Sequence, residues 1–245
     1  RRPEGQFGNT RDFTGGFSPI WRNDTKENTL RGCASDSLMY TVKSPAILKP
    51  LAKDLVWKMP AGKQHVYFTF DDGPTPGVTD VTLDLLRAKG ARATFFCLGK
   101  NVVQHPDLFQ RILSEGHAVG NHSYDHPDGW NTEQFFYLRN ILQASKYIPS
   151  NLFRPPYGRI TPAQVRALKA RYRIIMWHVL SADFDVKNSA RQCLDNVIEN
   201  TTDGSIVVFH DSLKAADRML YALEGSLNAL QQSGYTFESI QHELR

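Results

Sequence analysis

Residues 65–74 read HVYFTFDDGP, a run of β-branched and aromatic side chains that ends in two carboxylates and a Gly-Pro pair. The first six residues have the length and composition of a buried strand. Six further runs of this kind follow along the chain, at residues 93–97, 117–121, 152–154, 174–180, 205–210 and 235–240. The sequence therefore predicts a protein built around seven strands.

Segments with helical spacing of apolar residues lie between these runs. They include Val78, Val81, Leu85 and Leu86 in one segment and Leu220, Leu223, Leu227 and Leu230 in another. Two helix starts are marked, one by Thr161 before Pro162 and one by Asn131 or Thr132 ahead of Phe135, Leu138 and Leu142. Alternating strands and helices predict an α/β fold with a mainly parallel sheet and helices outside it, either a barrel or an open doubly wound sheet.

The chain divides into a polar start and a regular main part. Residues 1–38 are rich in Gly, Asn, Arg and Thr and predict a mostly disordered extension. Residues 39–63 are interpreted as a lead-in that packs on the main domain, residues 64–245, through Ile47, Leu48, Leu51 and Trp57. Met39 could be the natural start. With no signal visible, the cytoplasm is the default expectation, and a location outside it is the alternative if the chain is trimmed.

Composition excludes few functions by itself. The net charge is +4, from 29 basic and 25 acidic residues. The densest basic run consists of Arg166, Lys169, Arg171 and Arg173. We interpret this run as the solvated face of a helix and expect no nucleic-acid partner, because such binders show a larger clustered basic surface.

The cysteines and the apolar runs exclude other classes. Cys33, Cys97 and Cys193 are odd in number and far apart, so they predict neither a disulfide framework nor a cysteine zinc site. No stretch approaches the roughly 20 apolar residues that a transmembrane helix needs. We therefore expect a globular enzyme without a transmembrane segment, with a monomer as the default.

Ionisable side chains follow three of the predicted strands. The strand at 65–70 runs into Asp71 and Asp72, the strand at 117–121 into His122 and His126, and the strand at 205–209 into His210. The carboxyl ends of parallel strands share one rim, which carries the active site in α/β folds. We expect these five side chains to converge.

The residue types at this rim predict a metal site. Two adjacent carboxylates, Asp71 and Asp72, cannot both ionise cheaply unless a cation lies nearby. His122 and His126 are four residues apart, which places both imidazoles on one side of a helical turn. Two imidazoles and one carboxylate leave open positions on a divalent metal, and the other carboxylate is free to act as a base. The remaining histidines are interpreted as structural or exposed, namely His65, His105, His117, His178 and His242.

Five motifs in order resemble those of polysaccharide deacetylases, the NodB-like enzymes of carbohydrate esterase family 4. They are Thr69-Phe70-Asp71-Asp72-Gly73-Pro74, His122-Ser123-Tyr124-Asp125-His126, Arg154-Pro155-Pro156-Tyr157-Gly158, Ser181-Ala182-Asp183-Phe184 and Val208-Phe209-His210. The resemblance covers about residues 64–240. It implies a distorted (β/α)7 barrel and a carbohydrate substrate.

The resemblance also implies a role for each site residue. Asp72, His122 and His126 look like ligands of one divalent metal, usually Zn²⁺, with Co²⁺ or Ni²⁺ as alternatives. Asp71 looks like the catalytic base and His210 like the acid that protonates the departing amine. The supporting roles fall to Arg154, which would keep Asp71 ionised, Asp183, which would keep His210 protonated, and the backbone N–H of Tyr157, which would hold the oxyanion.

Two positions depart from the family pattern. Phe184 stands where many relatives have Trp, and Asp185 follows it, so either Asp183 or Asp185 could pair with His210. Val208 replaces a frequent Leu in the pocket for the acetyl methyl, which is a mild change.

The leading hypothesis is metal-dependent removal of acetyl groups from N-acetylated sugars of a chitin- or peptidoglycan-like polymer. One alternative is a hydrolase of the same fold that acts on acetylxylan or a cyclic imide. A non-haem iron oxygenase would use the same two His and one Asp but leaves Asp71 and His210 without a task. A non-catalytic carbohydrate-binding relative would be expected to have lost Asp71 or His210, and both are present.

Overall fold

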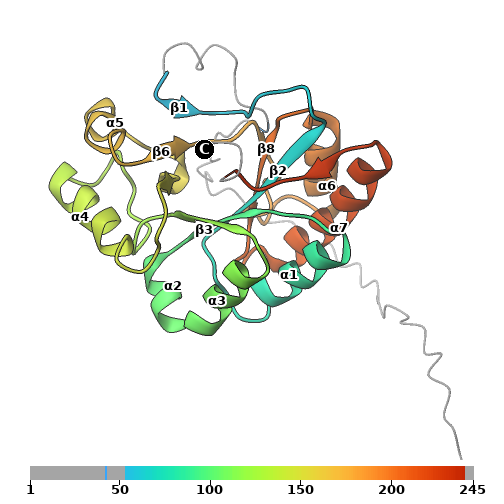
Figure 1. Ribbon diagram of the computed structural model, residues 1–245, viewed down its shortest axis with the longest axis horizontal. Helices are drawn as coiled ribbons and strands as arrows, with labels where there is room; N and C mark the ends of the chain where they lie inside the picture. Colours follow the sequence, from blue (N-terminus) through green and yellow to red (C-terminus); the bar gives the residue numbers. More distant parts are fainter. Residues whose placement is uncertain (1–41, 43–52, 241–245) are drawn as a thin grey trace, which may run out of the picture. The chain divides into compact units, whose positions relative to one another are not determined.

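A curled sheet of parallel strands organises the part of the chain that the computed structural model describes, residue 42 and residues 53–240 (Figure 1). Its strands are β1 (Leu55–Val56), β2 (His65–Asp71), β3 (Thr94–Cys97), β4 (Ala118–Asn121), β5 (Leu152–Phe153), β6 (Arg173–Ile175), β7 (Val179–Leu180), β8 (Ile206–His210) and β9 (Thr236–Phe237). The order is β1-β6-β5-β4-β3-β2-β8-β7, with β9 paired to β2 outside this path. Every pair of these strands is parallel. The sheet curls into a half-barrel, which agrees with the predicted distorted barrel.

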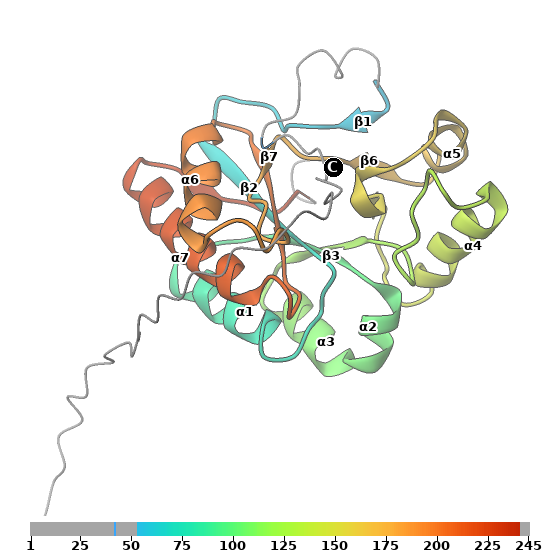
Figure 2. The same ribbon diagram turned by 180° about the vertical axis from the view of Figure 1, so that it is seen from behind.

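Helices follow one another around the outside of the sheet, as Figures 1 and 2 show from opposite sides. They are α1 (Thr79–Ala88), α2 (Gly99–Gln104), α3 (Pro106–Ser114), α4 (Gln134–Ala144), α5 (Pro162–Leu168), α6 (Ala190–Asn200) and α7 (Ala216–Gln232). The predicted cap of α5 is confirmed, because Thr161 and Gln164 form a reciprocal capping box and Pro162 occupies the first turn. Among the described helices, none is long and apolar enough to span a membrane.

Alternation along β2 separates the core from the site. Val66, Phe68 and Phe70 belong to the main hydrophobic cluster between the sheet and the helices. Tyr67 packs in a second cluster, and Thr69 and Asp71 share its face of the strand because side chains alternate. Both faces of β2 are therefore buried, and its inner face ends in a carboxylate.

Three strand predictions need correction. The predicted run at 174–180 is two short strands, β6 and β7, separated by Met176, Trp177 and His178. The two-residue strand β1 was not predicted, since it is too short to show a period. The last predicted strand, at 235–240, is confirmed only at Thr236–Phe237, as β9, which pairs with the start of β2.

Two predicted helices are confirmed, but the residues that they bury differ in part from the apolar residues that marked them in the sequence. In α1, Val81 is 41% exposed, and the buried residues are Thr79, Thr82, Leu83 and Leu86. In α4, Phe135 is 63% exposed and Leu142 is 45% exposed, while Tyr137, Ile141 and Ala144 are buried. Glu133, one or two residues after the predicted caps, accepts bonds from the backbone N–H groups of Phe135 and Phe136. The stripe of α7 is confirmed at Leu223, Leu227 and Leu230.

The predictions for the start of the chain are mostly untested. The predicted disordered extension at 1–38 lies outside the described residues, and so do Ile47, Leu48 and Leu51. Trp57 is partly buried against a cluster that includes Tyr172, and β1 pairs with β6. The described part of the lead-in thus contacts the sheet.

Candidate active site

The site lies at the carboxyl ends of β2, β4 and β8. Asp71 and His210 are register partners in the β2–β8 pair, so both strands end side by side in an ionisable group. His122 directly follows β4 and is buried. The structure therefore brings together the strand-end residues that the sequence predicted would converge.

Asp72, His122 and His126 form a compact triad. The Nε2 atom of His122 lies 3.7 Å from Oδ1 of Asp72, and the Nε2 atom of His126 lies 3.4 Å from the same oxygen. One ligand atom from each residue lies within 4.8 Å of the other two. Ligand atoms about 2.0–2.1 Å from a tetrahedral zinc ion are ~3.3 Å apart. The spacing therefore fits a divalent metal.

The two imidazole rings are prepared to offer nitrogen lone pairs to a metal. The Nδ1 atom of His122 is 2.9 Å from the carbonyl oxygen of Arg154, which can only accept, so Nδ1 carries the proton and Nε2 offers its lone pair. Burial, with the neighbouring His122, lowers the pKa of His126 to about 4. The His126 ring is therefore available as a neutral ligand, and the hydrogen bond at Nδ1 of His122 directs its Nε2 atom to the site.

The expectation that His122 and His126 share a helical turn is wrong. Residues 122–126 form an irregular loop in which Ser123 has φ +71° and His126 has φ +66°. Asn121 and Asn140 satisfy this loop, because their side-chain oxygens accept the N–H groups of Ser123 and Tyr124. A loop with left-handed residues brings the two rings to 5.0 Å between centroids instead.

Arg154 and Asp71 form an ion pair that is shut off from solvent. Arg154 is fully buried, and its Nη1 atom donates to Oδ1 of Asp71 at 2.7 Å. Its guanidinium also donates to the hydroxyl of Thr69 and to the carbonyls of Ile175 and Met176. Burial raises the pKa of Asp71, but the charges of Arg154, His122 and His210 and the hydrogen bond from Arg154 together outweigh burial, so the net pKa is lowered. The carboxylate is therefore held ionised.

Asp183, and not Asp185, contacts His210. Oδ1 of Asp183 lies 2.7 Å from Nδ1 of His210, and Oδ2 accepts the backbone N–H of His210 at 2.8 Å. Asp185 instead accepts the N–H of Lys187. Burial would lower the pKa of His210, but the charge and hydrogen bond of Asp183, together with the charges of Asp72 and Asp71, raise it to about 9. The imidazole is therefore held protonated at neutral pH.

Backbone strain concentrates at the site. Among the described residues, six other than glycine have positive φ, and five of them belong to the site loops. These five are Asp72, Ser123, His126, Tyr157 and Ala182, while Gln64 is the exception. Such conformations cost about 1–3 kcal/mol each and persist only where the surroundings enforce them. The loops therefore hold the functional groups in place at a cost in stability.

Four contributors to the site were missed by the sequence analysis. Thr69 shares the face of Asp71 two residues earlier on β2, so alternation could have found it. Asn101 donates to the carbonyl oxygen of Asp72 at 2.7 Å, and Arg218 donates to the carbonyl oxygen of Asp183 at 2.8 Å. Asp211 is fully buried and accepts the N–H of Gly73 at 2.9 Å. The contacts of Asn101 and Arg218 are long-range and leave no local signal.

The fold and the site define a class of protein: a parallel half-barrel that carries, at its strand ends, an Asp–His–His triad spaced to suit a metal and flanked by two buried ion pairs. A family model described as polysaccharide deacetylase matches residues 58–173. A peptidoglycan-N-acetylglucosamine deacetylase of Bacillus cereus is 34% identical over 198 residues, which are 78% of this chain and 93% of that protein. The chain belongs to the polysaccharide deacetylase family, so the resemblance and the prediction of a hydrolase of carbon–nitrogen bonds are confirmed.

Two further comparisons agree with this assignment. The peptidoglycan-N-acetylglucosamine deacetylase PgdA of Listeria monocytogenes is 38% identical over 184 residues, which are 72% of this chain but only 38% of that protein. The crystal structure of the Bc1960 peptidoglycan N-acetylglucosamine deacetylase matches with a TM-score of 0.75 and 29% identity, covering 82% of this chain and 96% of that one. The predicted NodB-like fold class is therefore confirmed.

Proposed function

We propose that this protein removes the acetyl group from N-acetylglucosamine units of a peptidoglycan- or chitin-like polymer, with Asp71 as base and His210 as acid. The observation that carries the proposal is the pair of opposed ion pairs beside the triad, Arg154–Asp71 and Asp183–His210. Hydrolysis of an amide needs a proton acceptor when water attacks and a proton donor when the amine leaves. Asp71, held ionised, would serve as the acceptor, and His210, held protonated, would serve as the donor.

Asp72, His122 and His126 are the residues that would hold the metal. A divalent ion bound there supplies a Lewis acid, which lowers the pKa of a water molecule and polarises a carbonyl group. The oxygen and two nitrogen donors suit zinc best, with cobalt and nickel as alternatives. Asn101 supports this arrangement, because it anchors the backbone carbonyl of Asp72.

Asp71 accepts the proton of the attacking water. Its Oδ1 atom is occupied by Arg154, and the ion pair keeps the carboxylate in the basic form. Attack on the acetamide carbon gives a tetrahedral oxyanion, and we assign its stabilisation to the backbone N–H of Tyr157. The preceding Pro155 and Pro156 restrict this segment before substrate binds.

His210 gives its proton to the leaving nitrogen, and the carbon–nitrogen bond breaks to release acetate and a free amine. Both oxygens of Asp183 bind His210, one at the ring and one at the backbone, so the ring is fixed in orientation and protonation state. The Phe184 ring also packs edge-on against His210, with 5.2 Å between centroids. Phe184 thus contacts the acid from the position where relatives often carry Trp.

The printed names of the relatives support N-acetylglucosamine in peptidoglycan as the first substrate to test. Acetate release should be measured side by side on peptidoglycan fragments, chitin oligomers and acetylated xylan. Release from the first two but not from xylan is expected. Release from xylan alone would favour an esterase of the same fold, and no release from any of them would contradict the proposal.

Three variants separate the catalytic roles from metal binding. Asp71→Asn and His210→Ala should each abolish acetate release while the metal content, measured by elemental analysis, stays near one ion per chain. His126→Ala should lose the ion itself. Loss of the ion in either of the first two variants would contradict the assigned roles.

A further inference from the structure

An exposed aromatic shelf adjoins the triad. It consists of Trp130, Arg159 and Tyr157, and the two aromatic residues, Trp130 and Tyr157, are 64% and 59% exposed. The guanidinium carbon of Arg159 lies 5.2 Å from the ring centre of Trp130 and 5.7 Å from that of Tyr157. Tyr157 in turn contacts His126, with 4.4 Å between ring centroids. The shelf therefore begins at the triad and leads away from it across the surface.

Contacts beneath the shelf hold it in place. Asp128 binds Nη1 of Arg159 at 2.5 Å and accepts the backbone N–H of Trp130 at 2.9 Å. The side chain of Gln164 donates to the carbonyl oxygen of Gly129 at 2.8 Å. A Cβ atom on Gly129 would lie 2.2 Å from the carbonyl oxygen of Arg159, so the two segments touch backbone to backbone. The rings are thus presented by loops that are already ordered.

The chemistry of the shelf suits an uncharged, flat and partly apolar ligand. Asp128 neutralises Arg159, which removes the charge that would attract a free anion. Large exposed aromatic faces beside a polar site mark a binding surface. The C–H faces of a pyranose ring match them, because aromatic faces carry partial negative charge. A polysaccharide chain that places one unit at the triad must also run across neighbouring surface.

We propose that the Trp130–Arg159–Tyr157 shelf binds the sugar ring next to the unit that loses its acetyl group. The inference rests on the proposed function, because it takes the substrate to be a chain of pyranose units. Trp130 supplies the stacking face furthest along the contact path from the triad, and Arg159 positions both rings. Tyr157 joins this subsite to the site of reaction.

Binding of N-acetylglucosamine tetramer to the full chain tests the shelf, by calorimetry in an Asp71→Asn background that does not turn the ligand over. Adding Trp130→Ala should weaken binding roughly 3- to 10-fold, as expected for the loss of one aromatic contact. Trp130→Phe keeps a ring and should retain most of the affinity. Because Trp130 is mostly exposed, the thermal midpoint of unfolding should not change.

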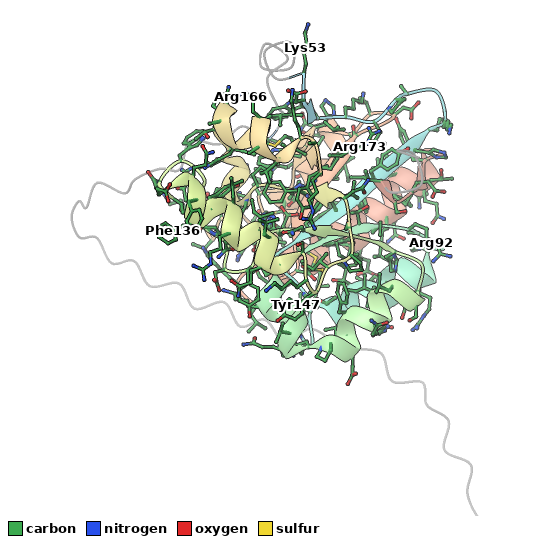
Figure 3. The ribbon with its side chains drawn as sticks, turned by 60° about the vertical axis from the view of Figure 1, so that its left-hand side comes forward. Lys53, Arg92, Phe136, Tyr147, Arg166 and Arg173 are labelled. Carbon is green, nitrogen blue, oxygen red and sulfur yellow. The ribbon has the colours of Figure 1, made fainter. Side chains whose placement is uncertain are left out.

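Phe136→Ala is the matched control. Phe136 is 60% exposed, and Figure 3 shows it on the outer side of α4. Its removal should leave the tetramer affinity unchanged. Equal affinities for the Trp130→Ala variant and its parent, or no measurable binding by the parent, would overturn the shelf. Acetate release by the unmodified chain tests the proposed function separately, so the two failures are distinguishable.

Discussion

The two ion pairs beside the triad have the same length and opposite construction. In one, a carboxylate faces the site and a buried guanidinium stands behind it, with 2.7 Å between Asp71 and Arg154. In the other, an imidazole faces the site and a buried carboxylate stands behind it, with 2.7 Å between His210 and Asp183. The first pair lowers a pKa and the second raises one. One fold thus keeps a base and an acid ready at the same pH.

The pairs differ in how far they are built into the fold. Arg154 bonds Thr69 on β2 and the carbonyls of Ile175 and Met176 at the end of β6, and its guanidinium lies 4.2 Å from the ring centre of Phe96 on β3. Asp183 bonds only His210 through its side chain among these site contacts. We infer that the Arg154 pair supports both stability and catalysis, whereas the Asp183 pair acts mainly on His210.

Replacing Arg154 by Met should have the largest effect. Asp71 would remain buried without a partner, a situation that costs about 3–5 kcal/mol. The pKa of Asp71 should rise, because burial is then no longer opposed by the guanidinium. We expect this loss in the free energy of unfolding, measured with urea at pH 7, together with loss of acetate release.

The double variant Arg154→Met, Asp71→Asn is the control for this interpretation. Removing both partners should recover part of the lost stability, although not the activity. If Arg154→Met alone were as stable as the unmodified chain, Arg154 would not contribute to stability as its contacts lead us to infer.

Replacing Asp183 by Asn should affect activity more than stability. Without the carboxylate, burial lowers the pKa of His210 from about 9, so the acid is deprotonated at neutral pH. In the unmodified chain, activity should fall as pH rises through about 9. In the variant this limb should move to lower pH, and acetate release at neutral pH should drop about 10²- to 10⁴-fold. A pH–rate profile measures both effects.

The His210–Asp183 pair should also make the free energy of unfolding depend on pH, because the pKa of His210 differs between the folded and unfolded chain. Because the folded pKa of His210 is raised, its contribution is complete below pH 6.5 and is lost as pH rises through about 9. That loss should vanish in Asp183→Asn. Asp185→Asn is the control, since Asp185 accepts the N–H of Lys187, and its profile should match the unmodified chain. A shifted limb in Asp185→Asn would instead implicate that residue.

The sequence was informative where the chemistry follows regular structure. Asp71, His122 and His210 could be placed together because each lies at the end of a parallel strand. The strand β2 could be predicted because residues 66–70 are all aromatic or β-branched. The loop between His122 and His126 could not be predicted, because its left-handed residues break the helical spacing assumed for it. Regular periods determine strands well, but they say little about the loops that complete a site.

Helix faces and long-range supports were harder to predict. In α4, two stripes fit a period of 3.6, and Tyr137 with Ile141 packs inward while Phe135 stays exposed. Tertiary contacts, not local hydrophobicity, chose between them. Arg218 reaches the carbonyl of Asp183 across 35 positions of sequence, a contact that no local pattern records.

Asp211 sharpens the comparison, because it is a third buried acid and no described residue forms an ion pair with it. Burial raises its pKa to about 8, although the hydrogen bond from Thr79 opposes the shift. The folded chain therefore keeps a proton that the unfolded chain releases near pH 4. In metal-free protein this group should lower the free energy of unfolding as pH rises from about 4 to about 8, by up to ~1.4 kcal/mol per pH unit.

Asp211→Asn should remove that slope, so the variant gains stability relative to the unmodified chain as pH increases. Urea unfolding at pH 5 and pH 7.5 in the presence of a chelator measures the difference. Asp203→Asn should behave in the opposite sense, because backbone N–H groups such as that of Gly62 lower the pKa of Asp203. Asp203→Asn should therefore lower the free energy of unfolding at neutral pH, and this decrease should become smaller in acid. A pH-independent effect of Asp211→Asn would refute a protonated Asp211.

The smallest expected effect comes from Gly120→Ala, which tests how closely the residues beneath Arg154 are packed. A Cβ atom on Gly120 would lie 2.4 Å from the ring of Phe96, which is fully buried beneath Arg154. A buried ring cannot move aside freely, so Gly120→Ala should cost about 1–3 kcal/mol of unfolding free energy. Because the strain falls on the ring that supports Arg154, acetate release should fall with stability.

Gly225→Ala offers the contrast on α7. There the added carbon would meet the side chain of Leu194 and no atom of either ion pair, so the pH–rate profile should be unchanged. Reduced acetate release only in Gly120→Ala would indicate that the packing of Phe96 under Arg154, and not only the charge of Arg154, supports catalysis. Equal behaviour of the two variants would mean that Arg154 is held by its hydrogen bonds alone, and that the Phe96 ring beneath it only fills space.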